Sequence, residues 1–441
     1  MIGAMAGQRI IYAVMTFLIS CTSTKMITTV DNPPPVKAIP PPRDSIKGDD
    51  FLENLLRQYP QYFGDILKNR KAMNLQIIYT QIDRGANGMP LLQDHLFNVD
   101  SSRYFYPAST VKLPIVLLAL QRLNELKDIG ISMNSTMITN KATSAQTSAY
   151  NDPTTADGRP SIAQYIRKIL LVSDNDAFNR LYEFLGQEYI NNELHKKGYN
   201  SAQVLHRLDV FLTEEENRNT NPISFLDSNN KVIYTQPAQK SKFRYEQRKD
   251  SIGEGYYKAG KLVHSPMDFS AKNRISLTDL HRVLLSLVFP AKLPAAQRFN
   301  ISDSDRAFVL KYMSQLPTES INPPYADDTT GYWPAYGKLL FYGRERGTVS
   351  KNIRIFNKEG DAYGHLLDIA YVVDTDKNIE FFVSAAIYCN SDGILNDDRY
   401  DYKTVGLPFM KNLGRVIYDY ELKRERKIKP DLGPFIFKYD R

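Results

Sequence analysis

Ser109 and Lys112 are the residues whose types and spacing most directly suggest covalent chemistry. They stand three positions apart in the segment Tyr-Pro-Ala-Ser-Thr-Val-Lys-Leu-Pro, directly before an uninterrupted apolar run at residues 115–120. Such a run predicts a helix that is buried on nearly all sides, and residues three apart share one face of a helix. We therefore expect a hydroxyl and an ammonium group within hydrogen-bond reach at the start of a buried helix.

A serine hydroxyl is a weak nucleophile at neutral pH and needs a base beside it. A lysine can be that base if burial and neighbouring cations lower its pKa, and the helix N-terminus acts in the same direction. The spacing alone is weak evidence, because average composition supplies about one or two chance copies of Ser-x-x-Lys in a chain of this length. A second copy, Ser228 to Lys231, lies in a polar stretch that predicts a loop.

Ser173, Asp174 and Asn175 form a second polar group, which precedes another helical pattern. Taken alone, this triplet is a good helix N-cap. The functional alternative is that the Ser173 hydroxyl relays a proton and the Asn175 amide binds an amide of the substrate.

The third group is Lys358, Glu359, Gly360 and Asp361, which lies shortly before an apolar run at residues 366–374. By itself this sequence predicts a turn. In a functional site the lysine could bind a substrate carboxylate, and the glycine would let the substrate approach the strand edge closely.

The order and spacing of the three groups resemble the Ser-x-x-Lys, Ser-Asp-Asn and Lys-Thr-Gly motifs of the serine β-lactamase and penicillin-binding-protein superfamily, with class A β-lactamases closest. The resemblance extends over roughly residues 50–420. It implies a serine hydrolase that forms an acyl-enzyme with a β-lactam or a related amide. Two alternatives stay open: a DD-peptidase or other penicillin-binding cell-wall enzyme, and a non-catalytic, lipid-anchored binding protein with a degenerate site.

The resemblance also implies a role for each residue of the three groups. Ser109 would be the nucleophile, Lys112 its activating base, and Ser173 the relay of a proton to the leaving nitrogen. The residues expected to bind the substrate are Asn175, Lys358, Gly360 and Asp361. The backbone N–H groups of Ser109 and Asp361 would form an oxyanion hole, in which one donor is typically worth about 3 kcal/mol.

Two departures from the family pattern bear on this prediction. Glu359 replaces a threonine or serine and brings an anion to a site expected to bind anionic substrates. Leu212 stands three residues after an Arg-Leu-Asp sequence, where class A enzymes carry the glutamate that activates the deacylating water. Leucine cannot act as a base, so we expect slow deacylation unless a glutamate at residues 214–216 reaches the site. We expect Arg207 and Asp209 of that sequence to form an ion pair that ties the loop.

Patterns on both sides of these motifs predict the elements that position them. β-rich runs near both ends of the globular region, with helical patterns between them, predict an α+β fold in which an antiparallel sheet is flanked by helices. The resemblance implies the β-lactamase-like, DD-peptidase/transpeptidase-like fold, with a helical lobe inserted at about residues 106–330. The expected strands are residues 75–82, 96–99, 353–356, 365–374 and 379–388, and the expected outer helices are residues 51–66 and 405–420.

Cys21 closes an N-terminal segment typical of an export signal. In residues 1–20, Arg9 precedes an apolar stretch that is too short for a comfortable membrane span. The stretch ends Leu-Ile-Ser-Cys and resembles the bacterial lipobox, in which the cysteine is diacylated after cleavage, and two acyl chains hold a protein on a membrane. We expect a lipoprotein of the cell envelope that faces the periplasm. A plain secretory signal and an N-terminal helix are the alternatives.

The rest of the chain divides into a linker and one domain. Residues 21–48 hold two proline triplets among polar residues, which predicts a stiff, extended linker. Residues 49–441 are expected to form the catalytic domain.

Composition narrows the range of partners. The net charge of +7 is spread along the chain, and its densest basic run, residues 423–429, suggests a solvated tail, so we expect no nucleic-acid partner. The six histidines show no pair at i, i+4 and no His-Glu-x-x-His, so we expect no metal and no cofactor. The expected partners are a small-molecule or peptidoglycan-derived substrate and the membrane. The sequence carries no signal for an oligomeric state.

Overall fold

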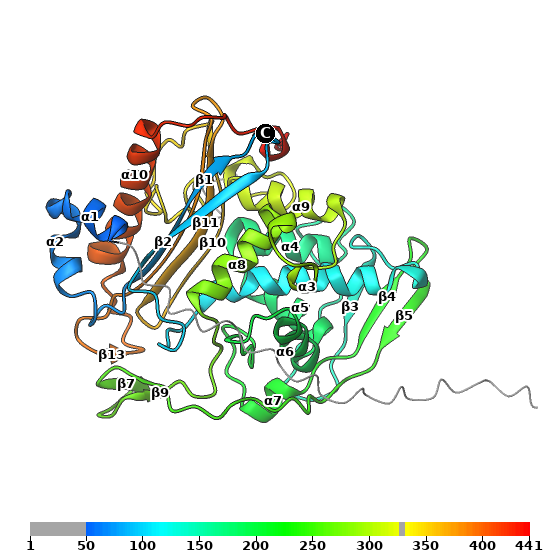
Figure 1. Ribbon diagram of the computed structural model, residues 1–441. Coiled ribbons are helices and arrows are strands. Elements are labelled where there is room, and N and C mark those ends of the chain that lie inside the picture. Colours follow the sequence, from blue (N-terminus) through cyan, green and yellow to red (C-terminus); the bar gives the residue numbers. More distant parts are fainter. Residues whose placement is uncertain (1–49, 326–330) are drawn as a thin grey trace, which may run out of the picture. The chain divides into compact units, whose positions relative to one another are not determined.

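The computed structural model describes residues 50–325 and 331–441 (Figure 1). The predicted signal peptide (1–20), the lipidation site Cys21 and the linker (21–48) lie outside the described residues. None of the helices in the described ranges is long and apolar enough to cross a membrane.

A five-stranded antiparallel sheet is formed by strands from both ends of the globular region. The spatial order is β10-β11-β12-β1-β2, so the C-terminal strand β12 pairs directly with the N-terminal strand β1. The strands are β1 (Gln76–Arg84), β2 (Pro90–Phe97), β10 (Ile353–Ala362), β11 (His365–Asp374) and β12 (Ile379–Tyr388). The α+β class with an antiparallel sheet is therefore confirmed.

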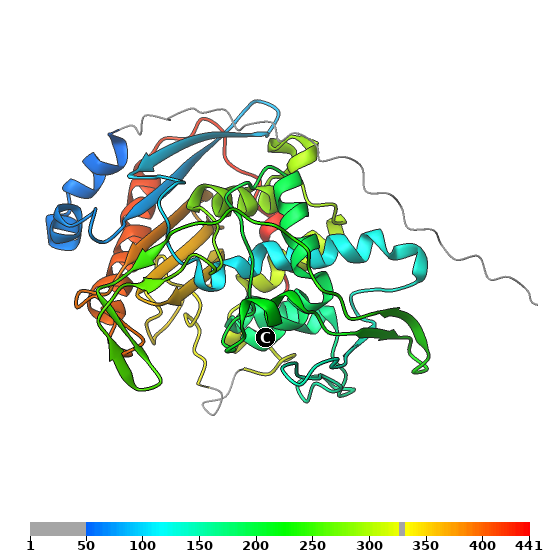
Figure 2. The ribbon, with the colours of Figure 1, turned by 90° about the horizontal axis from the view of Figure 1, so that it is seen from below.

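Helices cover both faces of this sheet, which explains why β11 and β12 are apolar along most of their length. In β11, Leu366, Ala370 and Val372 join the core on one face, whereas the alternating residues Leu367 and Ile369 join the core on the other. The first face carries α1 (Phe51–Arg57), α2 (Pro60–Lys68) and α10 (Leu407–Lys423), and the second carries α8 (Leu277–Val288) (Figures 1 and 2).

The second face also bears the helical lobe, which is built around α3 (Lys112–Glu125). Helix α3 packs against several neighbours and is buried on nearly all sides, as its unbroken apolar sequence predicts. A short 3₁₀ helix, η1 (Ala108–Val111), precedes α3 and carries Ser109. The surrounding helices are α4 (Ile162–Val172), α5 (Asn175–Leu185), α6 (Gln187–Lys196) and α9 (Asp303–Ser314).

The lobe is less purely helical than expected, because short strands form small sheets within it. The additional elements are β3 (Thr136–Thr139), α7 (Glu214–Arg218), β4 (Ile223–Leu226), β5 (Val232–Gln236), β6 (Ser251–Ile252), β7 (Gly255–Lys258), β8 (Lys261–Val263), β9 (Met267–Asp268) and, from the C-terminal region, β13 (Ile394–Leu395). Ser228 to Lys231, the second Ser-x-x-Lys copy, lies in the exposed connection between β4 and β5.

Two element boundaries differ from the sequence prediction for local reasons. Residues 51–66 form two helices, because Pro60 starts the new helix α2. Strand β10 runs past residue 356 to Ala362, so the third group lies within a paired strand and not in a turn.

The basic run at residues 423–429 is not simply a solvated tail. Arg424 and Arg426 both pair with the buried carboxylate of Glu421, which also accepts a hydrogen bond from Tyr79 of β1. These contacts attach the end of α10 to the sheet.

Candidate active site

The three polar groups meet where η1, the α4–α5 junction and β10 come together. The Ser173 hydroxyl lies 3.2 Å from Lys112 Nζ and 2.9 Å from Lys358 Nζ. One side chain from each group is therefore in direct contact, although the groups are far apart in sequence. This convergence is what the spacing of the motifs predicted.

Lys112 occupies the centre of the cluster and is fully buried. Its ammonium donates to the Ser173 carbonyl and, at 2.7 Å, to Asn175 Oδ1. Among the described residues no carboxylate lies within ion-pair distance of it. Burial and the nearby charge of Lys358 lower the pKa of Lys112 well below the usual lysine range, and more distant acidic groups only partly oppose this. Lys112 can therefore shed its proton far more easily than a solvated lysine.

Ser109 lies at the start of this helical segment and is half-buried, with its side chain lining a cavity. No hydrogen bond joins its hydroxyl to a group in the described parts of the chain, so it is free to approach either a base or a ligand. Catalytic hydrogen bonds often form fully only when substrate is present.

The backbone around the site is strained at several points. Ala108, Ser173, Asp209 and Tyr363 have φ angles of 47°, 60°, 56° and 51°, in the left-handed region that non-glycine residues rarely adopt. Each such residue costs about 1–3 kcal/mol, and strain of this kind clusters at functional sites. Ala108 directly precedes Ser109, so one of these strained residues lies within the segment of the predicted nucleophile.

The α4–α5 junction explains how the second group is positioned. Asp174, and not Ser173, is the N-cap of α5, and its carboxylate accepts a hydrogen bond of 2.7 Å from the Ala177 N–H. Ser173 ends α4 in its left-handed conformation. The capping and functional interpretations of this triplet are therefore compatible, because Asp174 caps the helix while Ser173 and Asn175 contact Lys112.

Gly360 brings the edge strand β10 against the nucleophile segment. A Cβ atom at this position would lie 2.6 Å from the Ser109 backbone nitrogen, closer than real Cβ contacts allow. Only glycine permits this approach. The next residue, Asp361, lines the cavity, and its carboxylate pairs with Arg344 at 2.7 Å.

Lys358 is not among the residues that line the cavity, and its side chain is only 1% exposed. Its ammonium lies 3.0 Å from Glu359 Oε1. Burial alone would raise the pKa of Glu359, but the charges of Lys358 and Arg344 outweigh it and lower the pKa. The unusual glutamate thus neutralises the lysine expected to bind a substrate carboxylate.

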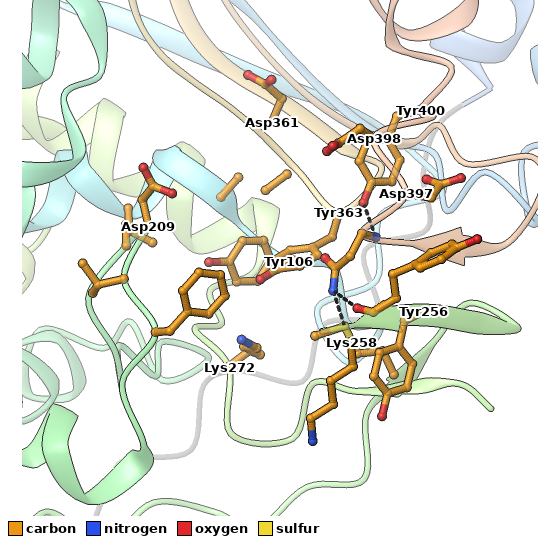
Figure 3. Close-up of a pocket in the computed structure, with 18 of the residues that line it drawn as sticks. Tyr106, Asp209, Tyr256, Lys258, Lys272, Asp361, Tyr363, Asp397, Asp398 and Tyr400 are labelled. Atoms are coloured by element: carbon orange, nitrogen blue, oxygen red, sulfur yellow. Dashed lines mark hydrogen bonds between the residues drawn. The ribbon is translucent and has the colours of Figure 1, made fainter. Parts of the chain in front are cut away.

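The cavity has a volume of about 1220 Å³, and its lining includes Ser109, Asn175 and Asp361. Figure 3 shows part of this lining, with Asp361 labelled. Its other walls come from residues 206–211, part of the loop that the Arg-Leu-Asp sequence indicated, and from the β7–β8 hairpin and residues 396–400, to which no sequence motif pointed. Tyr106 and Tyr363 form a T-shaped pair in the cavity, with ring centroids 5.1 Å apart. Their proximity to Ser109 and Asp361 in sequence is a local signal that could have identified them, whereas the hairpin has no such signal.

The loop at residues 206–211 differs from the prediction in its ion pairing. Arg207 pairs with the buried Glu183 of α5, at 3.1 Å, and not with Asp209. Arg180 pairs with the same carboxylate at 3.1 Å. Asp209 is exposed and lines the cavity, because its left-handed backbone turns it away from the buried arginine.

None of the glutamates at residues 214–216 lines the cavity, so none of them takes the place of the base that Leu212 cannot supply. Glu214 accepts a hydrogen bond from Tyr245, and Glu215 pairs with Lys240. Glu216 closes the capping box of α7 with Thr213. Leu212 itself is half-buried and also outside the cavity lining.

Within residues 50–325 and 331–441, no group of three or more His, Cys, Asp or Glu side chains could hold a metal ion. Cys389 is buried, and burial raises the pKa of its thiol to about 12.

A sequence model of the beta-lactamase enzyme family matches residues 61–420, and the chain belongs to this family. This membership agrees with the resemblance seen in the motifs and with the fold. A search of curated proteins gives no match.

Solved structures similar to this chain include a β-lactamase from Sphaerobacter thermophilus, with 12% identity, coverage of 82% of this chain and 97% of that chain, and a TM-score of 0.43. A class A β-lactamase from Clostridium kluyveri shows 14% identity, 82% and 98% coverage, and a TM-score of 0.45. A mutant of PBP-A, solved as an acyl-enzyme complex with penicillin G, shows 16% identity, 84% and 96% coverage, and a TM-score of 0.42.

Proposed function

We propose that this protein is a serine hydrolase that is acylated on Ser109 by a β-lactam or a related amide. The observation that carries the proposal is the state of Lys112: a buried ammonium with no carboxylate partner among the described residues, in contact with Ser173 and Asn175. A structural lysine is usually stabilised by a buried counter-ion. A general base for a serine needs the opposite, which is an environment that favours its neutral form.

In this proposal, neutral Lys112 takes the proton of the Ser109 hydroxyl as the oxygen attacks the substrate carbonyl. The backbone N–H groups of Ser109 and Asp361 would stabilise the oxyanion that forms. The carbonyl carbon–nitrogen bond then breaks, and Ser173 passes a proton to the leaving nitrogen. Contact of Ser173 with Lys112 and Lys358 supports this relay, because either ammonium can return a proton to the hydroxyl.

Release of the acyl group would be slow. Leu212 offers no base, and the neighbouring glutamates are engaged in contacts outside the cavity. This observation favours a second candidate within the same chemistry, a DD-peptidase or other penicillin-binding cell-wall enzyme. The cavity of about 1220 Å³ supports a peptide-like substrate, since small-ligand sites are usually about 300–1,000 Å³.

The first experiment is to incubate the protein with a fluorescent penicillin and follow its intact mass. Ser109→Ala serves as the control. A persistent adduct on Ser109 would support the penicillin-binding enzyme, and rapid turnover of a chromogenic cephalosporin would support a β-lactamase. If no adduct forms with lactams or D-Ala-D-Ala peptides, the site is a degenerate one in a binding protein. An adduct that still forms on Ser109→Ala would contradict the proposal.

We also propose that the protein is a cell-envelope lipoprotein anchored through Cys21, which would place the site in the periplasm near its peptidoglycan-derived substrates. The lipobox-like sequence supports this. Metabolic labelling with a tagged fatty acid should label the native protein and not Cys21→Ser. Equal labelling of both proteins would rule out this anchor.

A further inference from the structure

If the substrates carry a carboxylate, Lys358 is poorly suited to bind it. Its charge is compensated by Glu359 at 3.0 Å, and it is buried and not part of the cavity lining. Asp361, which does line the cavity, adds a further negative charge that is held by Arg344. An anionic group on the substrate would therefore need a different cation within the cavity.

The basic side chains that line the cavity are not equivalent. Arg207 is buried and committed to Glu183. Lys258 and Arg399 are exposed, so water and salt screen their charges. His206 is stacked on Tyr106, and burial lowers its pKa to about 4, so it is neutral at pH 7.

Lys272 is the cation that remains. It is half-buried, lines the cavity, and has no carboxylate within ion-pair distance in the described parts of the chain. Its ammonium lies 5.6 Å from the centroid of the Tyr363 ring, and Figure 3 shows it pointing into the cavity toward Tyr106 and Tyr363. Burial lowers its pKa, because nothing nearby compensates its charge.

The backbone that carries Lys272 is rigidly held. The neighbouring Asn273 is fully buried, and its side chain accepts hydrogen bonds from the Leu205 and His206 N–H groups, at 2.7 Å and 3.1 Å. Arg274 and Gln203 exchange two backbone hydrogen bonds of 2.8 Å. Because the backbone is already ordered, only the Lys272 side chain would lose conformational entropy when it binds a ligand.

Two ring contacts in succession connect Lys272 to the segment that carries Ser109. Its aromatic partner Tyr363 follows Asp361 by two residues, and Tyr363 packs on Tyr106, which precedes Ser109 by three residues. Through these ring contacts, Lys272 is connected to the two chain segments whose backbone N–H groups are expected to form the oxyanion hole.

We propose that Lys272 binds a carboxylate of the substrate, in place of Lys358, and so determines a preference for anionic acyl compounds. This inference rests on the proposed function, because it assigns the substrate class of the same site. The carboxylate would lie between the ammonium and the polar edges of Tyr106 and Tyr363.

The test measures binding separately from acylation. In Ser109→Ala protein, calorimetry gives the dissociation constants of benzylpenicillin and of its neutral methyl ester. Adding Lys272→Met should weaken binding of the carboxylate by about tenfold and leave binding of the ester within about twofold, whereas Lys272→Arg should keep most of the preference. Lys261→Met, which removes an exposed lysine of β8 outside the cavity, is the matched control.

The outcomes distinguish the two proposals. If Lys272→Met weakens both compounds equally, or neither, or if neither compound binds the Ser109→Ala protein, Lys272 is not the carboxylate site. If the preference depends on Lys272 but the protein with Ser109 intact never forms an adduct, the inference holds and the proposed hydrolase function fails.

Discussion

The two sides of the cavity differ sharply in how they are built. On one side, Lys112, Ser173 and Asn175 are joined by hydrogen bonds and supported by a fully packed helix. On the other side, residues 209–211 are exposed, and the Phe211 side chain has no protection from solvent. The proposed function assigns formation of the acyl-enzyme to the first side, whereas the second side offers only exposed groups, Asp209 among them, for release of the acyl group. Catalysis depends on groups that are in place before the reaction starts.

The largest effect should come from removing the proposed base. Lys112→Met should lower the acylation rate by about 10²–10⁴-fold, the usual contribution of a positioned base. Stopped-flow labelling with a fluorescent penicillin measures this rate. Thermal unfolding is the control: the variant loses the hydrogen bonds to Ser173 and Asn175 but also removes a buried charge that has no counter-ion, so it should remain folded with at most about 1–3 kcal/mol less stability. A stable variant that acylates at the parent rate would mean that Lys112 is only structural.

The next largest effect should come from the close approach of β10. Gly360→Ala places a methyl group 2.6 Å from the Ser109 nitrogen, so either the strand or the nucleophile segment must move. We expect acylation to fall by about 100-fold, because displacements near 1 Å can cost that much, and unfolding free energy to fall by about 1–3 kcal/mol. Gly64→Ala in α2, where the new Cβ would lie 3.9 Å from its nearest neighbour, is the matched control: it should leave acylation unchanged and, as a Gly→Ala change within a helix, should raise the unfolding free energy by up to about 1 kcal/mol. A normal acylation rate in Gly360→Ala would show that the approach is not needed.

A change on the weaker side of the cavity should sharpen the comparison. Leu212→Glu introduces a carboxylate at the position where the family pattern expects one, and should speed loss of the acyl group by about tenfold. This is below the usual gain from a positioned base, because residue 212 does not line the cavity. The decay of the adduct in intact-mass spectra gives the rate. Glu214→Gln should leave the decay unchanged, since Glu214 bonds Tyr245 away from the cavity; faster or slower decay in this control would contradict the comparison.

The smallest expected effect is a shift in pH dependence. Acylation should increase as pH rises through the pKa of Lys112, since only the neutral amine can accept the serine proton. Glu359 favours the charged form of Lys112 and so raises its pKa. Glu359→Gln should therefore move the rising limb of the pH–rate profile to lower pH. A shift to higher pH, or none in a folded variant, would show that Glu359 does not act on the base.

Glu359→Gln should also affect the pH dependence of stability. The folded-state pKa of Glu359 is lowered by Lys358 and Arg344, so its contribution to stability is present at neutral pH and is lost as pH falls through the folded pKa. As the pH falls from neutral, the free energy of unfolding, followed by circular dichroism, should therefore decrease more in the parent than in Glu359→Gln. Parallel curves would contradict the lowered pKa.

Much of the fold could be predicted because its signals are local. The apolar run after Lys112 predicted a buried helix, and the alternating cores of β11 follow from a strand with both faces covered. Boundaries were harder to place. Lys358 and Gly360 read locally as part of a turn, and only pairing with β11 extends the strand through them.

The sequence by itself singled out Ser109, Lys112 and Ser173 as candidates for the chemistry, on type, spacing and motif order. Lys112 and Ser173 are in contact in the structure, and Ser109 lines the cavity together with Asn175. Only the tertiary structure decided which charged side chains pair with one another around these residues. The pairing of Lys358 with Glu359, the capture of Arg207 by Glu183 and the position of Lys272 in the cavity depend on burial and on contacts between distant segments. An ionic side chain carries no local signal of the partner it will find, since that partner is set by packing and not by periodicity.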